Sequence, residues 1–215
     1  NLQDFLAVQK LVALAKGSGD GVIVNGQTGD FISGGHIPKS LWHCSSPTVE
    51  SLFSAVVEKH YSLWTSLKTP DNLASLRKRF GQVLDLEANP PTSKKTIIGL
   101  YEQWEYQERQ AKFIVNGQRA YEFLGIDWAL PFWDREVVDF WRAVPQEYKF
   151  NQKLYKQYLE TWNFEKLFLG WTSTVWQWPG AMKAVLPILR LTRLVLGGGS
   201  RDWLLKRLLF FGMYR

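Results

Sequence analysis

A glycine-rich segment with one carboxylate follows a short apolar run near the start of the chain. The run Gly21–Val24 is β-branched and bounded by glycines, which is typical of a fully buried strand in a parallel sheet. Open α/β sheets bind ligands just beyond the carboxyl ends of their strands. Glycines let backbone amides approach phosphate oxygens there, and Asp30 is suited to hold a magnesium ion. Residues 21–38 therefore predict a nucleotide-phosphate site.

The order of residues in this segment resembles a known motif. Residues 25–36 read Asn-Gly-Gln-Thr-Gly-Asp-Phe-Ile-Ser-Gly-Gly-His. The second nucleotide-site motif of the asparagine synthetase family reads Ser-Gly-Glu-Gly-(Ser/Ala)-Asp-Glu-x-x-Gly-Gly-Tyr. Gln27 and Phe31 each stand where the family has a carboxylate. The resemblance implies these site residues: Asp30 and Gln27 as catalytic residues, Asn25, Gly26, Thr28 and Gly29 as nucleotide-binding residues, and Asp30 also as the metal ligand.

A second block extends the resemblance later in the chain. Glu108 and Arg109 lie on a predicted long helix, and residues 125–134 then read Gly-Ile-Asp-Trp-Ala-Leu-Pro-Phe-Trp-Asp. The family has Asp-Arg on a helix, followed by Gly-x-Glu-x-Arg-x-Pro-Phe-Leu-Asp. Asp127 is a conservative replacement, whereas Ala129 replaces the arginine. The resemblance covers about residues 21–159 and is nearest to the subgroup associated with polysaccharide biosynthesis.

The resemblance implies an α/β fold: the mostly helical C-terminal portion of an adenine-nucleotide α-hydrolase-like (HUP) domain, with a short remnant of parallel sheet. It implies an ATP- and Mg²⁺-dependent ligase that adenylates a carboxylate substrate. Nitrogen from ammonia or glutamine then displaces AMP, and the use of glutamine would involve a glutaminase domain or partner. The family's pyrophosphate loop, Ser-Gly-Gly-x-Asp-Ser, is absent from the chain. We expect that loop upstream of Asn1, and we expect the 215 residues alone to be inactive.

Simpler interpretations exist for the same residues. The segment 26–35 also fits an ordinary loop, and Asp30 also fits a helix cap. Glu108 and Arg109 also fit an ion pair on a helix surface or between helices, and residues 131–134 fit packing followed by an N-cap. The three histidines lack metal-ligand spacing and are expected to be structural: His36, His43 and His60. The neutral replacements at residues 27, 31 and 129 leave a second function open, a catalytically degenerate binding or scaffolding module in surface-polysaccharide assembly.

Composition restricts the size of the core, the cellular location and the partners that can be expected. A chain of 215 residues that is 46% hydrophobic, with 11 Trp, can bury one substantial core. The single Cys44 fits a reducing, cytoplasmic location. The net charge of +6 resides entirely between Lys183 and Arg215, so it does not predict a nucleic-acid partner. That basic tail is expected to form solvated amphipathic helices, with peripheral contact to a membrane as the alternative.

Helical spacing and breakers divide the chain into elements. Residues 2–16 are expected to form a helix, and Ser46 is expected to cap another with Pro47 at its first position. Thr69 with Pro70, and Ser93, are expected to start two more. The helix after Ser93 is predicted to run to Leu124. Further elements are an extended segment at 128–131 and a helix capped by Asp134. The predicted domains are residues 1–180 for the synthetase-like domain and 181–215 for the basic helices.

Overall fold

The computed structural model describes residues 2–15 and 21–167. The chain divides into two compact units, residues 1–162 and 163–215, and each is considered by itself. In the second unit, the described part contains one short helical turn, η6 (Phe164–Lys166). The predicted boundary at residue 180 and the basic tail lie outside the described residues and stay predictions.

The first unit is a mostly helical α/β structure with a short parallel sheet, as the sequence predicted at this coarse level. In the described part of the chain, no helix is both long and apolar enough to cross a membrane. Its helical segments, in chain order, are α1 (Leu2–Ala15), α2 (Gly29–Ile32), α3 (Lys39–His43), α4 (Val49–His60), η1 (Thr65–Leu67), α5 (Pro70–Val83), α6 (Lys94–Trp104), η2 (Glu105–Val115), η3 (Asn116–Gln118), α7 (Arg119–Phe123), η4 (Pro131–Trp133), α8 (Arg135–Ala143), α9 (Gln146–Lys149), η5 (Phe150–Gln152) and α10 (Lys153–Trp162).

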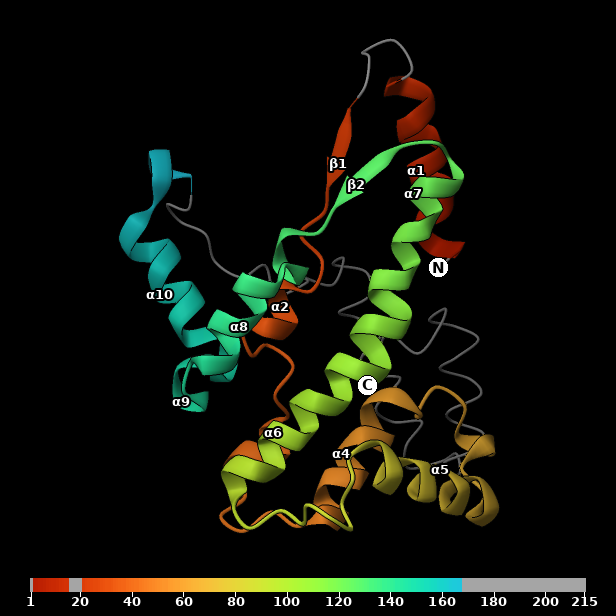
Figure 1. Ribbon diagram of the computed structural model, residues 1–215, viewed down its shortest axis with the longest axis vertical. Helices are drawn as coiled ribbons and strands as arrows, with labels where there is room; N and C mark the ends of the chain where they lie inside the picture. Colours follow the sequence, from red (N-terminus) through yellow and green to blue (C-terminus); the bar gives the residue numbers. More distant parts are fainter. Residues whose placement is uncertain (1, 16–20, 168–215) are drawn as a thin grey trace, which may run out of the picture. The chain divides into compact units, whose positions relative to one another are not determined.

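Two strands from distant parts of the sequence lie side by side (Figure 1). Strand β1 (Val22–Val24) pairs in parallel with β2 (Asp127–Ala129), with Ile23 opposite Trp128. This confirms extended backbone at Trp128 and Ala129, whereas the predicted extension to Pro131 is wrong because η4 begins there. The predicted full burial of β1 is wrong, because the side chains of Val22 and Val24 are 57% and 67% exposed. Both point to the same face, since side chains alternate along a strand, and no described element covers that face.

Side-chain caps define where several helices begin. Thr69, Ser93 and Asp134 each accept a hydrogen bond from a backbone amide in the first turn of the following helix, as predicted. The prediction for Ser46 is wrong, because the cap of α4 is Thr48. Its hydroxyl accepts from the amide of Ser51, and the Ser51 hydroxyl accepts from the amide of Thr48, forming a reciprocal capping box.

The predicted helix from residue 94 to 124 is continuous but not uniform (Figure 1). After α6 the backbone widens into the π-helical segment η2, then tightens through η3 into α7. Gly125, with φ of +71°, follows its end as predicted. Wider π-helical turns are rare and often occur at functional sites, and here the change begins at Glu105.

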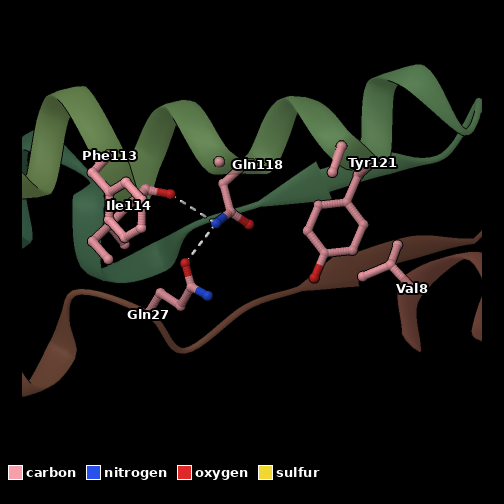
Figure 2. Close-up of a pocket in the computed structure, with 8 residues that line it drawn as sticks. Val8, Gln27, Phe113, Ile114, Gln118 and Tyr121 are labelled. Carbon is pink, nitrogen blue, oxygen red and sulfur yellow. Dashed lines mark hydrogen bonds between the residues drawn. The ribbon is translucent and has the colours of Figure 1, made fainter. Parts of the chain in front are cut away.

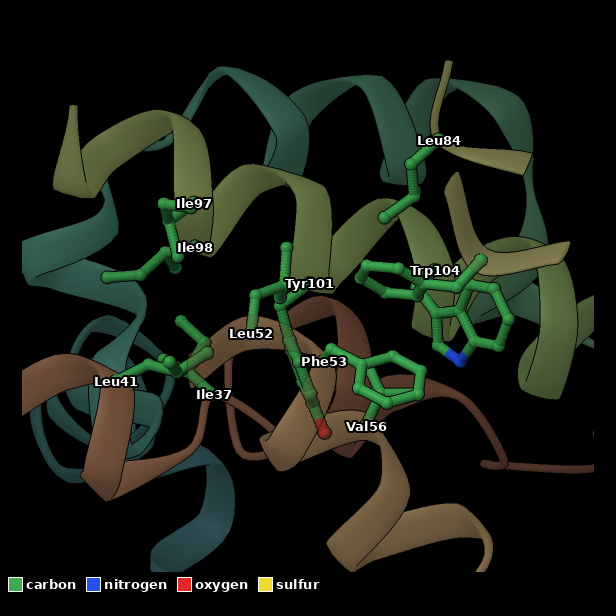
Figure 3. Packing of buried hydrophobic residues seen from close by; sticks show 11 residues of the cluster. Ile37, Leu41, Leu52, Phe53, Val56, Leu84, Ile97, Ile98, Tyr101 and Trp104 are labelled. Atoms are coloured by element: carbon green, nitrogen blue, oxygen red, sulfur yellow. The ribbon is translucent and has the colours of Figure 1, made fainter. Parts of the chain in front are cut away.

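The main hydrophobic core fixes this long helix against α4 and α5 (Figure 3). The Phe80 ring lies 5.3 Å from the rings of both Phe53 and Trp104, so one aromatic side chain joins three helices. Tyr101 is fully buried among them. Burying an aromatic side chain of this size contributes roughly 1.5–3 kcal/mol. The packing therefore sets the position of Glu105, the residue immediately after Trp104.

Gly34 is expected to tolerate no side chain. Its φ is +91°, and a Cβ built there would overlap the carbonyl group of Lys149. We expect Gly34→Ala to lower the free energy of unfolding by about 2–4 kcal/mol, from backbone strain and steric overlap together. Urea denaturation measures this loss. Gly117→Ala is the control, because a Cβ built there meets no other part of the structure within 4 Å; equal effects of the two changes would contradict the prediction.

Candidate functional site

The segment predicted to bind nucleotide begins directly at the end of β1. The amide of Asn25 donates to the carbonyl of Ala129 at 2.9 Å, which extends the strand pairing by one residue. Thr28 then has φ of +73°, in the left-handed region that favours glycine. Thr28 is 2% exposed, and its hydroxyl has no hydrogen-bond partner among the described residues. Helix α2 follows, with Asp30 in its first turn.

Amide side chains attach this segment to the long helix (Figure 2). Gln118 donates from Nε2 to Gln27 Oε1 at 2.6 Å and to the carbonyl of Ile114 at 3.0 Å. Asn25 donates from Nδ2 to Gln118 Oε1 and to the Tyr121 hydroxyl, both at 3.2 Å. The cavity beside these groups is only about 30 Å³. The network therefore positions the segment and leaves no room for a ligand of its own.

Asp30 is the charged residue among the predicted site residues, and its side chain is exposed. Its side chain is 64% exposed. Oδ1 accepts from the amide of Phe31 at 2.8 Å, and Oδ2 lies 2.9 Å from His36 Nε2. The hydrogen bond from His36 lowers the pKa of Asp30 despite partial burial, so the carboxylate is ionised at neutral pH. An accessible anionic oxygen is available at this position for a cation.

His36 connects Asp30 to a second carboxylate, that of Glu105, which is completely buried. His36 Nδ1 lies 2.7 Å from Glu105 Oε1, while Arg109 Nη1 and Lys59 Nζ lie 3.2 Å and 3.6 Å from the same oxygen. On Oε2, the Tyr101 hydroxyl donates at 3.4 Å. His60 Nε2 lies 2.7 Å from Oε2 but is not aligned for a hydrogen bond.

These contacts lower the pKa of Glu105 and raise the pKa of His36. Burial alone would raise the pKa of Glu105, but the contacts with His36, His60 and Lys59 outweigh it and hold the pKa well below its usual range. Burial opposes protonation of His36 too, yet its bonds to Asp30 and Glu105 raise its pKa. Burial lowers the pKa of Lys59, partly offset by Glu105. Glu105 is thus a buried anion surrounded by basic side chains.

Sequence reasoning missed Glu105 and Lys59. The histidines were expected to be structural, and the structure places His36 and His60 on one carboxylate. The helical spacing could have identified Glu105, because it lies four residues after Tyr101 on the predicted inner face of the helix. An acidic residue at an inward position requires a partner.

The alternative pairing of Glu108 with Arg109 is wrong. Glu108 pairs with Lys112, one turn along the helix, and Arg109 pairs with Glu105, one turn back. Adjacent residues on a helix point about 100° apart, whereas residues four apart share a face. Arg109 is thereby directed to the buried cluster rather than to its sequence neighbour.

The two sequence blocks meet in the structure. A Cβ built on Gly29 would lie only 2.9 Å from the ring of Phe132, so the two residues are in direct contact. Phe31 packs in a small core with Phe132 and Trp141. Tyr106 of the long helix stacks on Trp133, with ring centroids 4.5 Å apart. Asp127 and Ala129, which align with family glutamate and arginine, lie on β2 beside β1.

The side chains near Asp30 fit only a metal ion that needs few ligands from the protein. Among residues 2–15 and 21–167, no three His, Cys, Asp or Glu side chains are arranged to hold an ion. Mg²⁺ needs no such cage, because it commonly binds through one or two carboxylates, with water and substrate phosphates completing its coordination. The exposed carboxylate of Asp30 fits that mode of binding.

A larger open hollow of about 810 Å³ lies elsewhere on the first unit. Its lining combines exposed apolar residues after α4, such as Tyr61 and Trp64, with residues of α5 and the long helix, such as Arg79 and Lys112. None of the predicted site residues lines it. The predicted nucleotide segment and this hollow are therefore separate features.

Comparison with known proteins adds no assignment: no family model, no curated protein and no solved structure matches the chain. What the chain's own geometry defines is a mostly helical α/β protein. An exposed carboxylate lies after a parallel strand and is linked by His36 to a buried anionic centre.

Proposed function

We propose that this chain is part of an ATP-dependent, amide-forming ligase of the asparagine-synthetase type, with a HUP-like domain. The observation that carries the proposal is the contact between Gly29 and Phe132, which joins the two sequence blocks beside a pair of parallel strands. An accidental resemblance would give no reason for segments so distant in the chain to meet. Ligands of α/β proteins bind at such strand ends.

Backbone conformation supports the alignment with the family motif. Thr28 stands where the motif has glycine, and its φ of +73° is one that glycine adopts without strain. Gly34 and Gly35 stand on the paired glycines. A Cβ on Gly34 would overlap Lys149, and one on Gly35 would lie 2.8 Å from the carbonyl of Asp30. Three of the four positions that the motif reserves for glycine, residues 28, 34 and 35, are therefore ones where a positive φ or a close neighbour favours glycine, whereas nothing restricts Gly26.

The proposed reaction has two steps. A substrate carboxylate attacks the α-phosphate of ATP, giving an acyl-adenylate and pyrophosphate. Ammonia, released from glutamine by a glutaminase domain or partner, then attacks the acyl carbon, loses a proton and displaces AMP. Both steps depend on alignment and charge neutralisation rather than on a covalent enzyme intermediate. Asp30 would hold the Mg²⁺ that neutralises the phosphates, and the backbone of residues 25–29 would contact the nucleotide.

The test is substrate-dependent turnover. Full-length protein, supplied with ATP, Mg²⁺, glutamine and candidate carboxylates, is expected to release AMP and pyrophosphate in equal amounts only when a carboxylate is present. Release of ADP and phosphate would identify a different class of ATP-dependent enzyme. Isolated residues 1–215 are expected to show no turnover, because the chain lacks the family's pyrophosphate loop.

A catalytically degenerate binding or scaffolding module in surface-polysaccharide assembly is the second candidate. Phe31, which stands where the motif has a second carboxylate, is 6% exposed and belongs to a hydrophobic cluster. Gln27 replaces the other carboxylate, and its amide oxygen is occupied by Gln118. Calorimetry with ATP and Mg²⁺ on the full-length protein separates the candidates: binding accompanied by turnover supports the ligase, whereas binding without turnover for any carboxylate supports the module.

Gln27→Glu is expected to fold normally. Gln118 Nε2 already donates to Gln27 Oε1, and a glutamate oxygen at the same position accepts that hydrogen bond equally well. We therefore expect the free energy of unfolding to change by less than about 1 kcal/mol. Gln27→Leu, which leaves the Gln118 amide without this acceptor, is expected to lose about 1–3 kcal/mol. Urea denaturation of both variants checks the difference, and a loss for Gln27→Glu as large as that for Gln27→Leu would refute it.

A further inference from the structure

The basic side chains around Glu105 have more donors than this carboxylate can satisfy. His36, Arg109 and Lys59 all approach the same oxygen, Oε1. Lys59 Nζ, at 3.6 Å, is beyond hydrogen-bond distance. Arg109 carries five N–H donors, and only one of them has an acceptor among the described residues. Glu105 therefore fixes these two side chains in place and leaves most of their donors available.

Lys59 and Arg109 remain accessible to a ligand. Their side chains are 32% and 34% exposed, whereas Glu105 is 0% exposed. Both also lie close enough to Asp30 for their charges to interact with its carboxylate. An anion that approaches beside Asp30 meets preoriented, partly desolvated cations.

We propose that Lys59 and Arg109 form a binding site for the phosphate oxygens of pyrophosphate, next to the Mg²⁺ position at Asp30. A planar guanidinium can contact two phosphate oxygens together, while an ammonium acts as a point charge, so the pair suits a polyphosphate. The choice of pyrophosphate rests on the proposed ligase, in which this anion is the leaving group. Glu105 acts here as a positioning residue, because it contacts the two cations and not the ligand.

Calorimetry with inorganic pyrophosphate, in the absence of Mg²⁺, tests the site on the 215-residue chain. Lys59→Gln and Arg109→Gln are each expected to weaken binding about tenfold, the effect of losing a charge-assisted contact. Lys112→Gln, a basic residue on the same helix as Arg109 but paired with Glu108, is the matched control and is expected to change nothing. Asp30→Asn is expected to tighten Mg²⁺-free binding, because a repelling carboxylate is removed. Equal binding by the wild type, Lys59→Gln and Arg109→Gln, or no binding by the wild type, overturns the proposal.

A second measurement needs no mutation and covers the case of a variant that fails to fold. The wild-type chain is treated with an amine-acylating reagent, with and without pyrophosphate, and modification of individual lysines is followed by mass spectrometry. Pyrophosphate is expected to slow acylation of Lys59 and to leave that of Lys112 unchanged; equal rates at Lys59 with and without it contradict the proposal. Failure of the ligase proposal appears separately, as pyrophosphate binding at Lys59 and Arg109 in a full-length protein that never releases AMP.

Discussion

Asp30→Asn is expected to lower kcat/KM for carboxylate-dependent release of AMP and pyrophosphate by about 10²–10³-fold in the full-length protein. The variant keeps the size and shape of the side chain but removes the negative charge that would hold Mg²⁺. Asn can still accept the hydrogen bond from the amide of Phe31, which now goes to Asp30 Oδ1 at 2.8 Å. We therefore expect the activity to fall while the protein stays folded. Steady-state kinetics over a range of Mg²⁺ concentrations measure the loss, and excess Mg²⁺ is expected to restore only part of it.

Asp139→Asn is the matched control for this experiment. Asp139 has a comparably exposed side chain, and its ion pairs within the described part of the chain are exposed ones with Arg135 and Arg142 on α8. We expect its replacement to leave turnover unchanged, since such surface pairs contribute little to stability and none of the three residues belongs to the candidate site. Undiminished turnover in Asp30→Asn would remove Asp30 from the mechanism, even if the ligase reaction itself were demonstrated.

Local rules predicted the parts of the fold that depend on neighbouring residues. Thr69, Ser93 and Asp134 cap helices because their side chains reach an amide two or three residues away. The Thr48 cap was missed because several Ser, Thr and Pro residues are adjacent there, and sequence alone does not say which one takes the extended conformation. The exposed face of β1, which carries Val22 and Val24, was missed for another reason. A short apolar run indicates a strand, but its burial depends on what covers the sheet.

The candidate site likewise has one part that the local sequence predicts and another part that it does not. Asp30 and the glycines around it were predicted because a motif places them within a few residues of one another. The buried centre was missed because its members come from separate elements: His36 after α2, Lys59 and His60 on α4, and Glu105 and Arg109 on η2. Periodicity assigns a residue to the inner face of one helix, but it does not identify the partners that another helix presents. Neither does it predict the wider turns that begin at Glu105.

Glu105→Gln is expected to destabilise the protein more than a neutral replacement of Asp30, Glu108 or Asp139. Glutamine fills the same space, but four basic side chains are left around a neutral group: His36, Lys59, His60 and Arg109. Removing one partner of a buried ion pair costs about 3–5 kcal/mol, which corresponds to a fall in Tm of about 10 °C for a protein of this size. Differential scanning calorimetry at neutral pH measures the change.

The destabilisation caused by Glu105→Gln is expected to be largest near neutral pH and to become smaller in acid. The pKa of Glu105 is lower in the folded protein than its ordinary value of 4.5, so near and below that pH the unfolded state binds more protons. The stability contributed by the charge is therefore complete above about pH 4.5 and disappears as the pH falls toward the folded-state pKa. Wild type and Glu105→Gln should differ most near neutral pH and converge in acid. Glu108→Gln is the control: within residues 2–15 and 21–167 its carboxylate pairs only with exposed Lys112, so a loss below about 0.5 kcal/mol is expected. A loss for Glu105→Gln as small as this, or one that grows as the pH falls, would show that the buried charge does not hold the cluster together.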